Sequence, residues 1–217
     1  MSGQNSPEKK KRKFSLPDVS LVNVKKSEKE TDAVHFGDLN VGWDTTRINM
    51  SGGRSTGHFG TGVYFVSKDV ADKTLANKDH RLNIHGKRPY HYMDLSGLNL
   101  YKATTSNRAY TLHEFLKTIS WLVHTGNWPD PQARFNYRHP DNRLWHNLAM
   151  DIITLGFSFD IDKTLAIIKI ELIREKKMPK SEIRSISTRV MLRLGYQGID
   201  VRHTDMDNFQ YGSVIYI

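Results

Sequence analysis

The chain has 217 residues, of which 38% are hydrophobic and 25% are charged, a composition typical of one good-sized globular domain with room for a tail. It contains no cysteine, which excludes disulfides, a thiol nucleophile and thiolate metal sites. No stretch approaches the roughly 20 apolar residues of a spanning helix, and residues 1–30 lack the apolar run of a secretion signal. We therefore expect a soluble, cytoplasmic protein without a membrane partner.

The front of the chain holds much of the positive charge. Lysine and arginine total 32 against 23 acidic residues, a net charge of +9, and residues 1–30 hold eight basic and four acidic side chains. We interpret residues 1–30 as a flexible basic arm and residues 31–217 as one folded domain. The run Pro7-Glu8-Lys9-Lys10-Lys11-Arg12-Lys13 resembles a nuclear localisation signal, which in a eukaryotic cell would direct the chain to the nucleus. The same run would bind nucleic acid by counterion release, although a solvated tail without a dedicated partner explains it equally well.

Strand-prone runs and turn residues alternate in the first half of the domain. A strand is predicted to begin at Val34, and a glycine-rich stretch over residues 40–62 separates it from a second short strand over residues 63–66. Residues 69–77 have the spacing of a short helix, and residues 90–101 resemble a strand region that is interrupted at Ser96-Gly97.

Helical patterns are more frequent in the second half. Thr111 and Glu114 have capping-box spacing, which predicts a helix that begins at Thr111 and ends at Gly126. A second helical face ends at Gly156, residues 165–173 are strongly β-like, and a third helix over residues 181–194 is closed by Gly195. Strands over residues 198–201 and 213–217 follow. The predicted fold class is α+β, with a split and largely antiparallel sheet and flanking helices.

Three pieces of sequence combine histidine, tyrosine and glycine in a distinctive order. They are Val34-His35-Phe36-Gly37, then Phe59-Gly60-Thr61-Gly62-Val63-Tyr64-Phe65, and last Gly195-Tyr196-Gln197-Gly198-Ile199 with the closing Tyr211-Gly212-Ser213-Val214-Ile215-Tyr216. Together they resemble the ADP-ribosyltransferase superfamily, in the branch that places His, Tyr and Glu on three strands, as diphtheria-toxin-like and poly(ADP-ribose)-polymerase-like domains do. Phage-encoded and polyvalent-protein members are similar, and the resemblance covers residues 33–217.

The resemblance implies an ADP-ribosyltransferase-like split antiparallel sheet and an NAD-dependent mono-ADP-ribosyltransferase, an enzyme of the glycosyltransferase class. Such enzymes cleave the nicotinamide–ribose bond of NAD and transfer ADP-ribose to an acceptor. The transition state carries positive charge on the ribose, which the protein must stabilise. We expect NAD as a substrate, no metal, and a macromolecular acceptor, with protein preferred over nucleic acid.

The resemblance also implies roles for individual residues. His35 would hydrogen-bond the adenosine-side ribose, and the backbone of Phe36 and Gly37 would approach the nicotinamide amide. Tyr64 would stack on the nicotinamide ring. The main chain from Gly57 to Gly62, which includes Gly60 and Thr61, would pass close under the dinucleotide. On chemical grounds alone, Arg54 or His58 would suit the pyrophosphate. Taken alone, each of these residues is more often structural, because strand histidines and tyrosines usually pack in the core.

The sequence departs from the family pattern at three points. The glycine after the histidine is shifted by one position, and Leu75 stands where a second stacking tyrosine is common. The glutamate that usually opens the last strand is replaced by Gly212, so the nearest polar candidates for the catalytic position are, in order of preference, Asp207, Gln210 and Asp205. An aspartate would supply the negative charge, whereas a glutamine would only bind the ribose hydroxyl.

Other chemistries have weaker support. The chain holds no HExxH, Walker A or GxSxG motif, and His80, His85 and His91 lack metal-ligand spacing, so we interpret these histidines as surface residues. Two alternatives to the transferase stay open. One is a module on the same fold that binds a nucleotide or ADP-ribose without transfer, and the other is a nucleic-acid-associated protein that acts through its basic arm.

Overall fold

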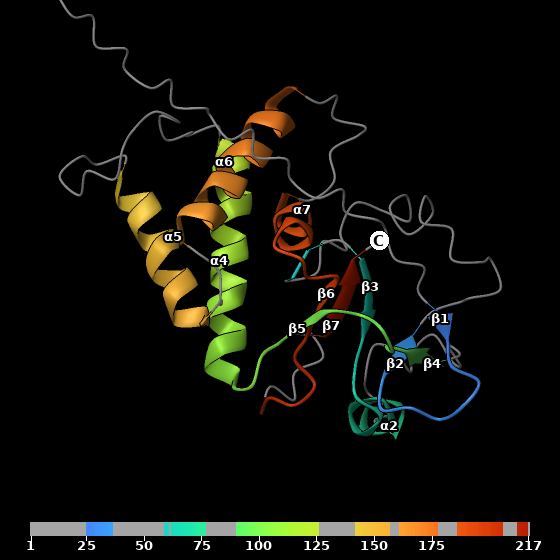
Figure 1. Ribbon diagram of the computed structural model, residues 1–217. Coiled ribbons are helices and arrows are strands. Elements are labelled where there is room, and N and C mark those ends of the chain that lie inside the picture. The colour runs from blue at the N-terminus through green and yellow to red at the C-terminus, as the bar shows by residue number, and fades with distance from the viewer. Residues whose placement is uncertain are drawn as a thin grey trace, which may run out of the picture.

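The chain folds as a mixed α+β protein. Figure 1 shows the computed structural model, which describes residues 25–36, 59–60, 62–76, 90–125, 142–156, 161–177, 186–205 and 212–216. In this part of the chain a larger four-stranded sheet lies between a layer of helices on one side and a smaller three-stranded sheet on the other. None of the described helices is long and apolar enough to cross a membrane.

The larger sheet has the strand order β3-β7-β6-β5. Its strands are β3 (Gly62–Phe65), β5 (Leu100–Lys102), β6 (Gly198–Asp200) and β7 (Ser213–Tyr216). The β3–β7 and β6–β7 pairs are antiparallel and the β5–β6 pair is parallel. Side chains alternate across this sheet, as a strand requires: Val63 and Phe65 pack toward the smaller sheet, whereas Tyr64 packs toward the helices.

The smaller sheet has the strand order β1-β4-β2 and is antiparallel. Its strands are β1 (Lys25–Lys26), β2 (Val34–Phe36) and β4 (Tyr90–Asp94). Lys25 and Lys26, which the sequence assigned to the basic arm, therefore pair within a sheet. The two sheets meet where Val34 and Val66 exchange backbone hydrogen bonds, and α2 (Lys68–Ala76) follows immediately after this contact.

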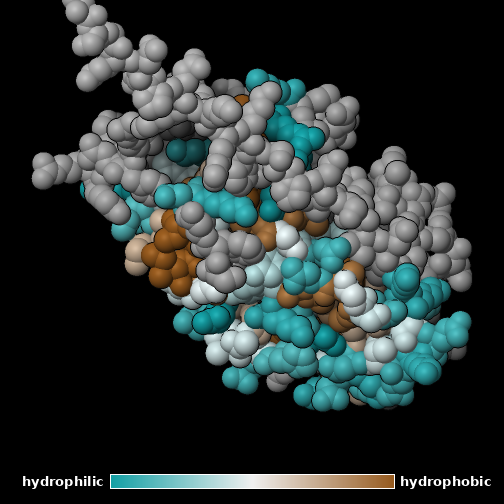
Figure 2. Space-filling model, viewed as in Figure 1, coloured by the Kyte–Doolittle hydropathy of each residue, from teal (hydrophilic) through white to brown (hydrophobic). Residues whose placement is uncertain are grey.

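The helical layer consists of α4 (Ser106–Thr125), α5 (Asn142–Leu155), α6 (Ile161–Lys177) and α7 (Ile186–Arg193). These helices and the adjacent face of the larger sheet bury the main hydrophobic cluster of the described chain. α5 and α7 end where the sequence predicted, because Gly156 and Gly195 adopt positive φ angles of 62° and 94°. Figure 2 shows hydrophobic surface over α5, which exposes Met150 and Ile153.

Two predictions of secondary structure are wrong. Residues 165–173 form part of α6 and not a strand, because Leu165, Ile168 and Leu172 repeat at helical spacing and are buried together. Both the odd-numbered and the even-numbered positions of this segment include apolar residues, so the segment lacks the alternation of polar and apolar side chains that is typical of a strand. α4 begins at Ser106 rather than at Thr111, because the Thr105 hydroxyl accepts a 3.2 Å hydrogen bond from the Arg108 N–H and caps the helix.

Candidate functional site

The junction of the two sheets brings His35 of β2 beside Tyr64 of β3. The Val34 and Val66 backbones are joined by two hydrogen bonds of 2.9 Å, which hold β2 alongside the end of β3. His35 Nδ1 lies 2.6 Å from the Tyr64 carbonyl oxygen. A carbonyl oxygen only accepts, so Nδ1 carries the proton in this contact and Nε2 is the acceptor nitrogen of the neutral ring.

The surroundings of His35 favour its neutral form. Burial disfavours the imidazolium and lowers the pKa of His35 below its ordinary value of 6.5, and the charge of His91 lowers it further. The hydrogen bond to the Tyr64 carbonyl opposes both effects but does not outweigh them. At neutral pH the His35 imidazole is therefore uncharged, and its Nε2 atom is a hydrogen-bond acceptor.

The Tyr64 phenol binds the turn that precedes β3. Its hydroxyl donates to the Gly60 carbonyl oxygen at 2.7 Å and accepts from the Phe59 N–H at 3.2 Å. From the neighbouring strand β7, the Tyr216 hydroxyl donates to the Phe59 carbonyl oxygen at 2.9 Å. Burial raises the pKa of Tyr64 above its ordinary value, so this phenol stays protonated and keeps the turn in place.

The two described glycines of this segment both face protein. A Cβ on Gly60 would lie 2.6 Å from the Thr188 hydroxyl oxygen of α7, and the φ of Gly60 is 111°. A Cβ on Gly62 would fall on the carbonyl oxygen of Ile215 in β7. Close packing inside the molecule is therefore enough to explain both glycines, and a role in approaching a dinucleotide stays a prediction.

The start of β7 carries no acidic side chain. Gly212 is buried, and Ser213 is the first residue of the strand, opposite Phe65 of β3. The Ser213 hydroxyl accepts a 2.9 Å hydrogen bond from the Val201 N–H and donates to Asp200 Oδ1 at 3.3 Å. Ser213 is thus engaged within the protein and does not replace the glutamate that the family pattern has at this place.

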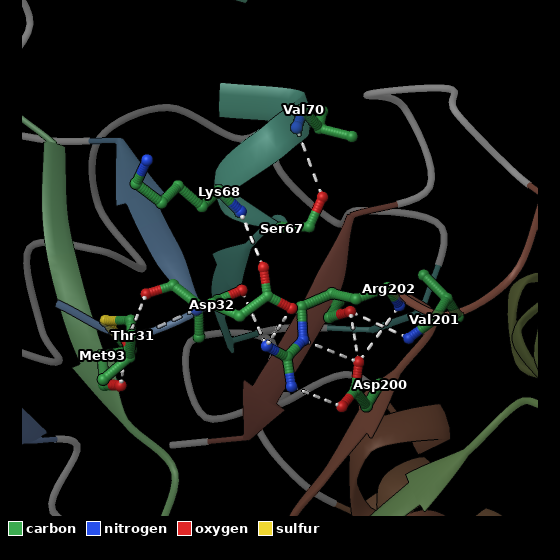
Figure 3. A network of polar contacts seen from close by, with 11 residues as sticks. Thr31, Asp32, Ser67, Lys68, Val70, Met93, Asp200, Val201 and Arg202 are labelled. Atoms are coloured by element: carbon green, nitrogen blue, oxygen red, sulfur yellow. Dashed lines mark hydrogen bonds and ion pairs between the residues drawn. The ribbon is translucent and has the colours of Figure 1, made fainter. Parts of the chain in front are cut away.

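An ion-pair network around Arg202 connects the two sheets (Figure 3), and it includes Asp200, to which the Ser213 hydroxyl donates. The Arg202 guanidinium binds both carboxylate oxygens of Asp200, at 3.0 and 2.8 Å, and donates to the Asp32 carbonyl oxygen at 2.7 Å. Asp32 also accepts from the Lys68 N–H at the start of α2. Burial by itself would raise the pKa of Asp200, but the hydrogen bonds and the charge of Arg202 outweigh burial and lower it.

His91 is a residue of this site that the sequence interpretation missed. It lies on β4 directly opposite His35, its side chain is half-buried, and its Nε2 atom is buried. The expectation that His91 is a surface residue is therefore wrong. Its position beside His35 depends on the pairing of β2 with β4, which the local sequence around residue 91 does not predict.

The remaining predicted residues are only partly described. Phe36 is the last residue of β2, where it pairs with Tyr90, and Asp205 is exposed beyond the end of β6. The other candidates lie outside the described residues, namely Gly37, Arg54, His58, Thr61, Asp207 and Gln210. The run at residues 7–13 also lies outside them. Within the described ranges, no group of three or more histidine and acidic side chains is placed to hold a metal ion.

Comparisons of this chain with protein-family models, with curated proteins and with solved structures found no match.

Proposed function

We propose that this protein is an NAD-dependent mono-ADP-ribosyltransferase with an ADP-ribosyltransferase-like fold and a macromolecular acceptor, preferably protein. The observation that carries the proposal is the 2.6 Å contact between His35 Nδ1 and the Tyr64 carbonyl oxygen. It joins the histidine strand to the tyrosine strand, the two segments on which the resemblance to this family depends.

The arrangement of three strands supports this function. β2 carries His35 and meets β3, which carries Tyr64, and β3 pairs along its length with β7. The family pattern reads its His, Tyr and Glu from three strands in this chain order. A neutral His35 suits the chemistry, because an acceptor nitrogen binds a ribose hydroxyl and adds no positive charge beside a cationic transition state.

In the proposed reaction, the bond between nicotinamide and the ribose breaks, and nicotinamide leaves with the electron pair. A lone pair of the acceptor then forms the new bond to the ribose carbon, and the acceptor loses its proton. An acidic group beside the ribose would stabilise the positive charge in between. We assign this task to Asp207, then to Gln210 as a hydroxyl-binding substitute, then to Asp205.

A second function is favoured by the start of β7. Gly212 has no side chain and the Ser213 hydroxyl is held by Val201 and Asp200, so the described part of β7 offers no carboxylate for the ribose. A module that binds NAD or ADP-ribose without transferring it would need His35 and Tyr64 but no such carboxylate. This second candidate predicts NAD binding without release of nicotinamide.

Incubation with labelled NAD and a mixture of candidate acceptor proteins tests the proposal. We expect label transfer by the wild type and a loss of about tenfold or more in His35→Ala, because a ribose hydroxyl then lacks its partner. Tyr64→Phe keeps the ring and removes the bonds to the Phe59–Gly60 turn, so it should also lose activity.

His146→Ala on α5 is the control, since His146 belongs to neither sheet. Equal labelling by the wild type, His35→Ala and His146→Ala would reject the site. NAD binding without labelling or nicotinamide release would select the binding module instead.

A further inference from the structure

His35 and His91 form a cross-strand pair of imidazoles. In the antiparallel pairing of β2 with β4, His35 stands directly opposite His91. Directly opposite residues point to the same face of a sheet, and their Cβ atoms lie about 4.5–5.5 Å apart. Both side chains are half-buried, so the charge on one ring is poorly screened from the other.

Two rings in this position cannot both gain a proton at low cost. The first proton to bind places a positive charge beside the second imidazole, which disfavours its protonation, so the two rings titrate as a coupled pair. A charge on His91 accordingly lowers the pKa of His35, in addition to the larger effect of burial.

The other strand packed against β2 supplies a different contact. From β3, Tyr64 offers its carbonyl oxygen to His35, while its phenol is turned to Gly60 and stays uncharged. Among the described groups that face His35 from β3 and β4, His91 is therefore the one whose charge lowers the pKa of His35.

We propose that His91 is a positioning residue of the site, which acts through His35 by disfavouring its imidazolium and so preserves Nε2 as the acceptor for a ribose hydroxyl of the dinucleotide. This inference rests on the proposed function for its ligand. The coupling between the two rings, in contrast, is a property of the protein alone and can be measured without NAD.

Proton NMR of the imidazole resonances between about pH 5 and pH 8 measures that coupling. His91→Gln replaces the ring with a neutral amide, so we expect His35 to titrate at a higher pH than in the wild type, closer to 6.5. His146→Gln on α5 is the matched control and should leave the His35 curve unchanged. An identical His35 curve in the wild type and His91→Gln overturns the proposal.

The wild type provides a second measurement should His91→Gln not fold. Each of the two imidazoles should show an inflection at the midpoint of the other, because each proton alters the field at its neighbour. Two independent single-site curves would overturn the proposal without any variant.

Calorimetric titration with NAD tests the role in ligand binding. Below the pKa of His35 the affinity should fall about tenfold per pH unit, because the bound state excludes one proton. In His91→Gln this fall should begin at a higher pH, with affinity near pH 8 about equal to that of the wild type. The same pH dependence in both proteins overturns the inference. An NMR shift with no NAD binding in any variant overturns the proposed function and the ligand role together, and leaves the coupling of the two rings intact.

Discussion

Gly60 combines two constraints that an alanine would violate. Its φ of 111° is a conformation that side chains rarely adopt, and a Cβ would lie 2.6 Å from the Thr188 hydroxyl oxygen. We expect Gly60→Ala to lower the free energy of unfolding by about 2–4 kcal/mol, from backbone strain and overpacking together. Urea denaturation followed by circular dichroism measures this loss.

Gly97→Ala is a matched control, because Gly97 has a φ of 76° but a Cβ at this position would meet no atom within 4 Å. Gly97→Ala should lower the free energy of unfolding only by the cost of backbone strain, about 1–2 kcal/mol. Combining Gly60→Ala with Thr188→Ala should cost less than the sum of the single changes, because the clash is removed. Equal losses in Gly60→Ala and Gly97→Ala would contradict the packing explanation.

At the scale of single residues, the sequence did not predict what the candidate side chains contact. His35 contacts the main-chain carbonyl oxygen of Tyr64 at 2.6 Å, and its predicted role in binding NAD stays a prediction. The predicted roles of Gly60 and Gly62 concern a ligand, whereas their missing side chains face α7 and β7. Such contacts depend on residues far along the chain, and a local pattern carries no information about them.

The helix α6 shows what a buried polar residue contributes at the scale of an element. Glu171 is fully buried and its carboxylate binds Arg189 at 2.9 Å and Arg193 at 3.1 Å, both on α7. We expect Glu171→Ala to lower the free energy of unfolding by about 3–5 kcal/mol, because it leaves two arginines without their buried counter-charge. Thermal and urea unfolding of the purified variant measure the effect.

Arg189→Met is the comparison for this pair of helices, because Glu171 keeps its bond to Arg193 in that variant. Its loss should be clearly smaller than that of Glu171→Ala. A larger loss for Arg189→Met would show that packing of the arginine, and not the carboxylate, holds α6 against α7.

The ion pairs of Glu171 also explain why a strand was wrongly predicted over residues 165–173. In a strand, Glu171 would share one face with Leu165 and Ile173. In the structure, Ile173 is exposed, whereas Glu171 is buried together with its neighbour Leu172. Burial of a glutamate is rare unless a partner is present, and the partners of Glu171 come from another helix. Most short strands of the two sheets were easier to predict, because turn residues bound them locally, whereas β1 at Lys25–Lys26 was assigned to the basic arm.

At the scale of the whole molecule, the intermixed strand and helix patterns predicted the α+β class, which the structure confirms. They did not predict that β2 and β4 form one sheet with β1 while β3 joins β7, β6 and β5. That division places His35 and Tyr64 on different sheets, so the site depends on how the sheets are held together. Described contacts that do so include the Val34–Val66 bridge, the apolar cluster around Phe65 and the Arg202 network.

Asp200→Asn tests the Arg202 network, because it keeps the shape of the side chain and removes its charge. Asp200 is buried, so we expect a loss of about 3–5 kcal/mol in the free energy of unfolding at neutral pH. The pKa of Asp200 is lowered in the folded protein, so its stabilising effect is full above 3.8 and is lost as the pH falls through the folded value. The difference between wild type and variant should therefore shrink in acid, as urea titrations at a series of pH values would show.

Hydrogen exchange separates a contact between the sheets from general stability. If Arg202 holds the sheets together through Asp200 and Asp32, then Asp200→Asn should speed exchange of the Val34 and Val66 amides, which bridge the sheets. The amides of β7 inside the larger sheet should keep more of their protection. Asp32→Asn should change the exchange of both sets of amides little, and should lower the free energy of unfolding by less than about 1 kcal/mol. The reason is that the Asp32 side chain is 55% exposed and that its carbonyl contact with Arg202 remains. A uniform loss of protection across both sheets would show that Asp200 stabilises β6 and does not hold the sheets together. The junction between the sheets would then depend on its apolar contacts.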